Sequence, residues 1–144
     1  MKRLLIALTL VAVFATASFA AVKDFGAFTV DVPDGWTASQ EGPTAIIVKN
    51  DNTASLTITV DSTQGNSLGD LAAAFVETFK NGGQFKSVSS PEKDSDGDYS
   101  FTMVNNQDVE SKALLSEDSG KYILFVMTGE DEGISAMLGS IKEK

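Results

Sequence analysis

The chain has 144 residues, with 20 acidic and 11 basic side chains and neither cysteine nor histidine. Its length suits one domain with an ordinary hydrophobic core, and the lack of cysteine excludes disulfides and thiolate chemistry. The net charge of −9 disfavours nucleic acid and anionic membrane surfaces as partners, because both repel an acidic protein.

The first twenty residues have the pattern of a secretory signal peptide. A short basic head precedes an apolar run at 4–14, and small residues then lead to Ala20. This pattern predicts a signal peptide at 1–20 and one exported domain at 21–144, located in the periplasm or secreted. No cysteine stands at the cleavage point to carry a lipid anchor, so we expect a soluble product without membrane insertion.

Cleavage would make the remaining chain more acidic and would narrow its chemistry. It removes Lys2 and Arg3, which leaves 9 basic residues against 20 acidic ones and a net charge of −11. Arg3 is the only arginine, so the mature chain would lack arginine, histidine and cysteine. A catalytic site would then lack its usual base, thiol and anion clamp, which argues against an enzyme. The negative charge is compatible with cationic partners and divalent ions as ligands.

The first half of the expected domain shows the two-residue periodicity of β-strands. Residues 28–32 alternate apolar and polar side chains, and a Pro-Asp-Gly turn follows them directly before Trp36. Two further strands at 44–49 and 54–61 are separated by a short turn. They predict a hairpin.

The pattern then becomes helical. Apolar residues at helical spacing lie between Ser67, a predicted N-cap, and a stop at 81–83. A second helix is predicted to open at 130–132, whose carboxylates suit the positive end of the helix dipole. Between the helices, alternation predicts strands at 85–88, 99–103, 109–115 and 122–128, the last with two apolar faces and therefore central. The order predicts an α+β domain, with a largely antiparallel sheet of about six to seven strands covered by helices.

The two ends of this domain resemble a known family. The segment 28–36, Phe-Thr-Val-Asp-Val-Pro-Asp-Gly-Trp, and the closing helix running into 140–142, Ser-Ile-Lys, are similar to the ends of the PsbP/DcrB-like superfamily, and the element order between them also fits. The resemblance implies an α/β/α sandwich in a small exported or organellar protein that binds or assists other proteins. It implies no catalytic residues and carries over only Trp36, as a packing residue, which agrees with its place after a turn.

Residues 65–69, Gly-Asn-Ser-Leu-Gly, match the nucleophile elbow of serine hydrolases between a strand and a helix. A serine nucleophile needs a base, usually histidine, and this chain has none, so a lysine would have to serve. Ser67 has a simpler role, because its hydroxyl can accept a hydrogen bond from the helix N-terminus. We therefore expect a cap at Ser67, with a small hydrolase as a third interpretation.

An acidic segment resembles the first half of an EF-hand loop. Glu92, Asp94 and Asp96 stand at alternate positions, and Asp98 could supply a further oxygen. The twelfth position is Met103 instead of the bidentate Glu, and the residues before it alternate like a strand. A solvated turn is the first interpretation, and a calcium site is the alternative.

These observations favour a non-enzymatic exported binding or assembly-accessory protein. No cofactor is expected, and the partner would be another protein, with no nucleic acid involved. The alternative is a calcium-responsive binding protein that uses the turn at 92–98.

Overall fold

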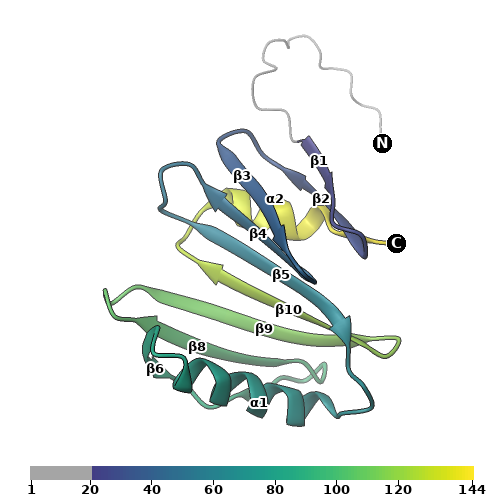
Figure 1. Ribbon diagram of the computed structural model, residues 1–144, viewed down its shortest axis with the longest axis vertical. Helices are drawn as coiled ribbons and strands as arrows, with labels where there is room; N and C mark the ends of the chain where they lie inside the picture. Colours follow the sequence, from purple (N-terminus) through teal and green to yellow (C-terminus); the bar gives the residue numbers. More distant parts are fainter. Residues whose placement is uncertain (1–20) are drawn as a thin grey trace.

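The computed structural model describes residues 21–144, which form two antiparallel sheets and two helices (Figure 1). The predicted signal peptide at 1–20 lies outside the described residues. The main sheet has eight strands in the order β3-β4-β5-β10-β9-β8-β6, with β7 paired to β8, and the small sheet has the order β1-β2-β11. The elements are β1 (Ala21–Asp24), β2 (Phe28–Val32), β3 (Trp36–Glu41), β4 (Thr44–Lys49), β5 (Ser55–Ser62), α1 (Leu68–Asn81), β6 (Phe85–Val88), β7 (Glu92–Lys93), β8 (Tyr99–Asn105), β9 (Glu110–Asp118), β10 (Lys121–Thr128), α2 (Glu132–Ser140) and β11 (Lys142–Glu143).

The antiparallel α+β architecture is as predicted, but the main sheet is larger than the six to seven strands expected. It gains β3 and the two-residue β7, while β2 joins the small sheet. From Thr37 to Glu41, β3 is almost wholly small or polar at the edge of the sheet, so it lacks the alternation that marks a half-buried strand. The β4–β5 hairpin and both helices lie where the pattern predicts them.

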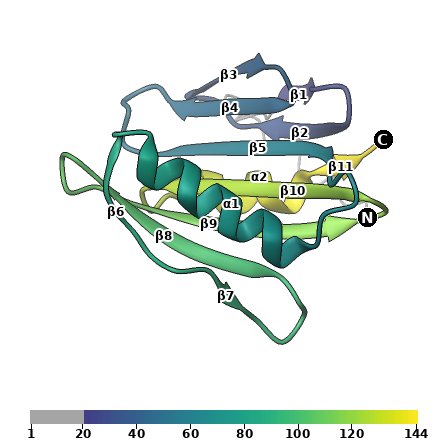
Figure 2. The same ribbon diagram turned by 60° about the horizontal axis from the view of Figure 1, so that its bottom comes forward.

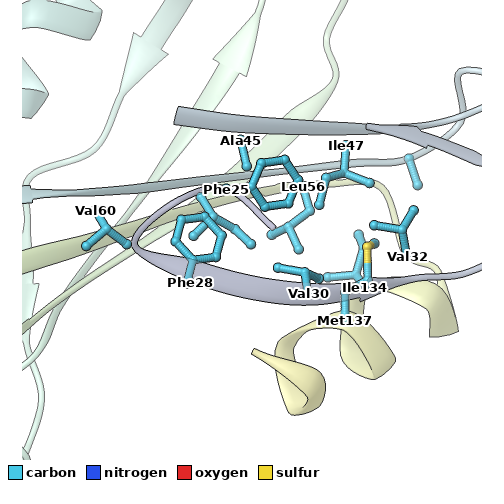
Figure 3. Close-up of a cluster of buried hydrophobic side chains, with 12 residues drawn as sticks. Phe25, Phe28, Val30, Val32, Ala45, Ile47, Leu56, Val60, Ile134 and Met137 are labelled. Atoms are coloured by element: carbon cyan, nitrogen blue, oxygen red, sulfur yellow. The ribbon is translucent and has the colours of Figure 1, made fainter. Parts of the chain in front are cut away.

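One hydrophobic core lies between the main sheet and a layer made by the small sheet and α2. Figure 3 shows Phe28 and Val30 of β2 and Met137 of α2 directed into the same cluster as Ile47 of β4 and Leu56 of β5. All five side chains are almost completely buried. The predicted sandwich therefore has a helix on this face, but α2 shares its layer with three strands.

A second core lies on the opposite face of the sheet, under α1. Figure 2 shows α1 in front of the sheet and α2 behind it. Ala72 and Val76 on the inner side of α1 pack against β8, β9 and β10. The buried sheet residues of this core are Phe101, Met103, Ala113, Leu115 and Leu124.

Strand β10 contributes to both cores, as its two apolar faces predict. Leu124 is buried under α1, whereas Ile123 and Phe125 pack against the core beneath α2. The strand pairs with β5 on one side and β9 on the other, so it joins the two halves of the main sheet. Each half is thereby covered on a different face.

Trp36 packs against the start of α2, as expected for a packing residue. The half-buried indole belongs to the edge of the core beneath α2. An ideal Cβ placed on Gly133 of α2 would lie 2.8 Å from both Cζ2 and Nε1 of the indole. A side chain at this position would therefore force the indole or the helix to shift, because the ring occupies the space that a Cβ would need.

We predict that Gly133→Ala lowers the free energy of unfolding by about 1–3 kcal/mol, because the added methyl clashes with the indole. Trp36→Ala alone should cost about 2–3 kcal/mol, since the ring is only half-buried. In the Trp36→Ala background, Gly133→Ala should no longer destabilise. Urea unfolding of the four proteins in this cycle measures the coupling.

Gly139→Ala is the matched control, because it lies in the same helix and its added Cβ would meet nothing within 4 Å. It should stabilise by up to about 1 kcal/mol through helix propensity. Equal effects of the two glycine substitutions would contradict the packing of Trp36 against Gly133.

Candidate functional site

The part of the main sheet made by β8 and β9 lacks a covering layer on its α2-side face. Pairing places Thr102 of β8, Lys112 of β9 and Met127 of β10 in one cross-strand row. Thr102 and Met127 are half-buried and Lys112 is exposed. The row leads toward α2, whose Ile134 is buried against the sheet.

Two hollows lie on this surface, and Lys112 lines both. The larger, of about 530 Å³, lies between α2 and the sheet and is lined by Glu110, Lys112, Met127, Glu130, Ile134 and Ser135, among others. The smaller, of about 300 Å³, lies over the other side of Lys112 and includes Ser89, Glu92, Ser100 and Thr102. We call the two hollows together the α2 groove.

The charged groups of the α2 groove are mostly free of ion pairs. Glu92, Glu110 and Glu130 are exposed, and none of them forms an ion pair with another residue of 21–144; the same holds for Lys112. The lining of the two hollows therefore carries these three glutamate carboxylates and one lysine ammonium group. The floor between them is partly apolar, because it includes Met127 and Ile134.

Asp131 is the exception, because it is held at the start of α2. Its Oδ1 accepts a hydrogen bond from the Gly133 amide at 2.8 Å, and its Oδ2 accepts one from Lys49 Nζ at 2.6 Å. The hydrogen bond from Lys49 and then that from Gly133 hold the pKa of Asp131 below its usual value, and the same carboxylate raises the pKa of Lys49. Asp131, which also lines the larger hollow, thus caps α2 and ties it to β4.

Two sequence-predicted sites have ordinary structural surroundings. The Ser67 hydroxyl accepts a hydrogen bond from the Asp70 amide at 3.1 Å, as expected of an N-cap. In the acidic turn, Asp94 Oδ1 accepts hydrogen bonds from the amides of Asp96 and Asp98, at 2.8 and 3.0 Å. The turn joins β7 to β8 and its Gly97 has a φ of 91°, which favours glycine.

The four predicted calcium ligands are only partly brought together. Burial, followed by the nearby charges of Asp94 and Asp96, raises the pKa of Asp98, while Glu92 lies in β7 and lines the smaller hollow. Within residues 21–144, no group of three or more acidic side chains has an arrangement that could hold a metal ion. Calcium binding by the turn remains an alternative for experiment.

Sequence reasoning did not single out the α2 groove. The sequence does contain a sign of this surface, because β8 and β9 carry polar or charged residues on the face opposite their buried side chains. Ser100, Thr102 and Lys112 lie on that face, whereas Phe101 and Ala113 are buried on the other. A charged residue in a strand marks a face that water reaches. Only the fold brings that face beside α2.

We predict that Asp131→Asn lowers the melting temperature at neutral pH. The variant's melting temperature should also fall less steeply than that of the wild type as the pH is lowered. The pKa of Asp131 is lowered in the folded state, so its ionised form stabilises the fold above the ordinary pKa of about 4, and this contribution disappears as the pH falls through the folded value. Thermal melts between about pH 7 and pH 2 test this. Lys49→Gln should flatten the acid limb in the same way, and variants with the wild-type slope would contradict the pairing.

We predict that calcium at about 1 mM raises the melting temperature by no more than about 2 °C, because even a site of roughly millimolar affinity adds only about 0.4 kcal/mol. Melts with calcium and with a chelator measure this. The control is Asp94→Asn with Asp96→Asn, which keeps the oxygen at position 94 that accepts both amide hydrogen bonds. A larger shift that the double variant abolishes would establish the calcium site.

In the part of the chain that the structure describes, 21–144, neither helix is long and apolar enough to cross a membrane. No protein-family model and no curated protein matches the sequence.

Comparison with solved structures identifies the fold. The solution structure of cyanobacterial PsbP (CyanoP) from Synechocystis sp. PCC 6803 matches with a TM-score of 0.53 and 11% sequence identity, over 92% of this chain and 97% of that chain. A crystal structure from Bacteroides thetaiotaomicron VPI-5482 matches with a TM-score of 0.48 and 12% identity, over 89% of this chain and 49% of that chain. The match to CyanoP spans both halves of the main sheet, and this protein therefore has a PsbP-like fold.

Proposed function

We propose that this protein is an exported, non-enzymatic binding or assembly-accessory protein whose partner is another protein. The observation that carries the proposal is the α2 groove, an uncovered part of the sheet with unpaired charged groups around a partly apolar floor. Protein interfaces combine such a floor with a polar rim. The PsbP-like fold agrees with the proposal.

Export rests on the sequence pattern of the first twenty residues. Cleavage after Ala20 would leave the described residues, 21–144, as the mature chain.

The proposal that the protein is not an enzyme rests on the residue types that 21–144 lacks and on the role of Ser67 as a helix cap. Residues 21–144 contain no histidine, cysteine or arginine, and hydrolases commonly use these residues as bases, nucleophiles or anion clamps. The hydroxyl of Ser67 is engaged as a helix cap.

We predict that immobilised 21–144 retains one or a few proteins from the exported fraction of the source cells at low salt. Retention should fall at physiological ionic strength, because exposed charges are then screened over about 8 Å. The control column carries an unrelated protein of similar net charge. An empty column, or the same proteins on both columns, would contradict the proposal.

Two further measurements test the other parts of the proposal. Intact mass of the native protein should place its N-terminus at Ala21, and a chain that still begins at Met1 would overturn export. A panel of ester and glycoside substrates should show no turnover, and turnover that Ser67→Ala abolishes would overturn the non-enzymatic assignment.

A further inference from the structure

We infer that the α2 groove binds an extended basic segment of the partner protein. This inference rests on the proposed binding function and adds the place of contact and the chemistry of the partner. Its basis is the shape of the groove, the composition of its floor and the charge of its rim.

The strands beneath the two hollows of the α2 groove together span the length of a short extended peptide. The groove reaches from Glu92 on β7 across β8 and β9 to Met127 on β10. Neighbouring strands lie about 4.8 Å apart, so these four strands span roughly 15 Å. An extended chain rises about 3.3 Å per residue, so four or five residues fill that length.

The floor suits the long side chains of lysine and arginine. Met127, which is half-buried, offers apolar contact for their methylene groups, and Ile134 adds the small part of its side chain that reaches the surface. The hydroxyls of Ser100, Thr102 and Ser135 line the same groove and can bond to the backbone of a bound segment. The floor therefore accepts an amphipathic side chain together with its main chain.

The charged side chains at the rim of the groove favour a positively charged ligand. Glu92, Glu110 and Glu130 present three exposed carboxylates without ion-pair partners among residues 21–144, against the single ammonium of Lys112. A basic segment would supply the missing cations, and the net charge of −11 over 21–144 would steer it toward the protein. A second copy of this chain would instead bring further negative charge to the same carboxylates.

Removing the charge of Lys112 and removing that of Glu110 should change the affinity for a basic ligand in opposite directions. Lys112 is the only cation lining the groove, so it opposes a basic ligand while Glu110, two residues away on the same strand, attracts it. Removing either charge leaves the buried cores unchanged, because both side chains are exposed.

The probe is a capped hexapeptide in which lysine alternates with leucine, compared with the same peptide carrying glutamate for lysine. Titration into ¹⁵N-labelled 21–144 should shift the amide signals of Ser100, Thr102, Lys112 and Ser135 with the basic peptide only. Glu110→Gln with Glu130→Gln should raise the Kd about threefold to tenfold. Lys112→Gln should lower the Kd about twofold to threefold.

The matched control is Glu77→Gln with Glu117→Gln, which removes two exposed carboxylates from α1 and from the α1-side face of β9. It changes the net charge by the same amount and should change the Kd by less than twofold. Equal weakening by both double variants, binding of the acidic peptide, amide shifts outside the groove, or no binding of the basic peptide would each overturn the inference. Concentration-dependent dimerisation that shifts these same amides would assign the groove to a second copy instead.

The outcomes separate this inference from the proposed function. Retention of exported proteins that is unchanged by Glu110→Gln with Glu130→Gln would keep the binding function and overturn the groove as its site. Specific binding of the basic peptide beside an empty column would keep the groove and contradict the proposed partner in the exported fraction.

Discussion

The structure depends on β10, the strand whose side chains are needed on both faces of the sheet. It pairs along its length with β5 and β9, so within the described sheet the half made by β3, β4 and β5 pairs with the half made by β9, β8 and β6 only through it. Leu124 enters the core under α1, while Ile123 and Phe125 enter the core under α2. A polar substitution on either face would therefore leave one core without part of its packing surface.

Because the two cores are offset along the sheet, each covering layer protects only one half of one face. The α2 layer covers the half that contains β4 and β5, and α1 covers the half that contains β8 and β9. In each half of the sheet, the face that carries no covering layer stays accessible, and the core on the other face remains complete. The α2 groove results from this offset, since it combines the flank of α2 with strands that α2 does not reach.

Most of the fold was predictable because the buried elements carry strong periodicity. The stripe of α1, the alternation of β5 and the doubly apolar β10 all reflect burial that the structure confirms. Strand β3 was missed because edge pairing needs backbone groups and no apolar face. The groove could not be predicted because Glu92, Lys112 and Ser135 come from distant segments, and only the antiparallel order of the sheet brings them to one surface.

The distribution of aromatic side chains separates the two cores spectroscopically. The single tryptophan of the chain, Trp36, packs at the core beneath α2, whereas both tyrosines, Tyr99 and Tyr122, pack at the core under α1. Indole fluorescence therefore reports the docking of α2, and tyrosine absorbance reports that of α1. Coincident transitions by the two signals would mean that the offset cores unfold as one cooperative unit, joined through β10.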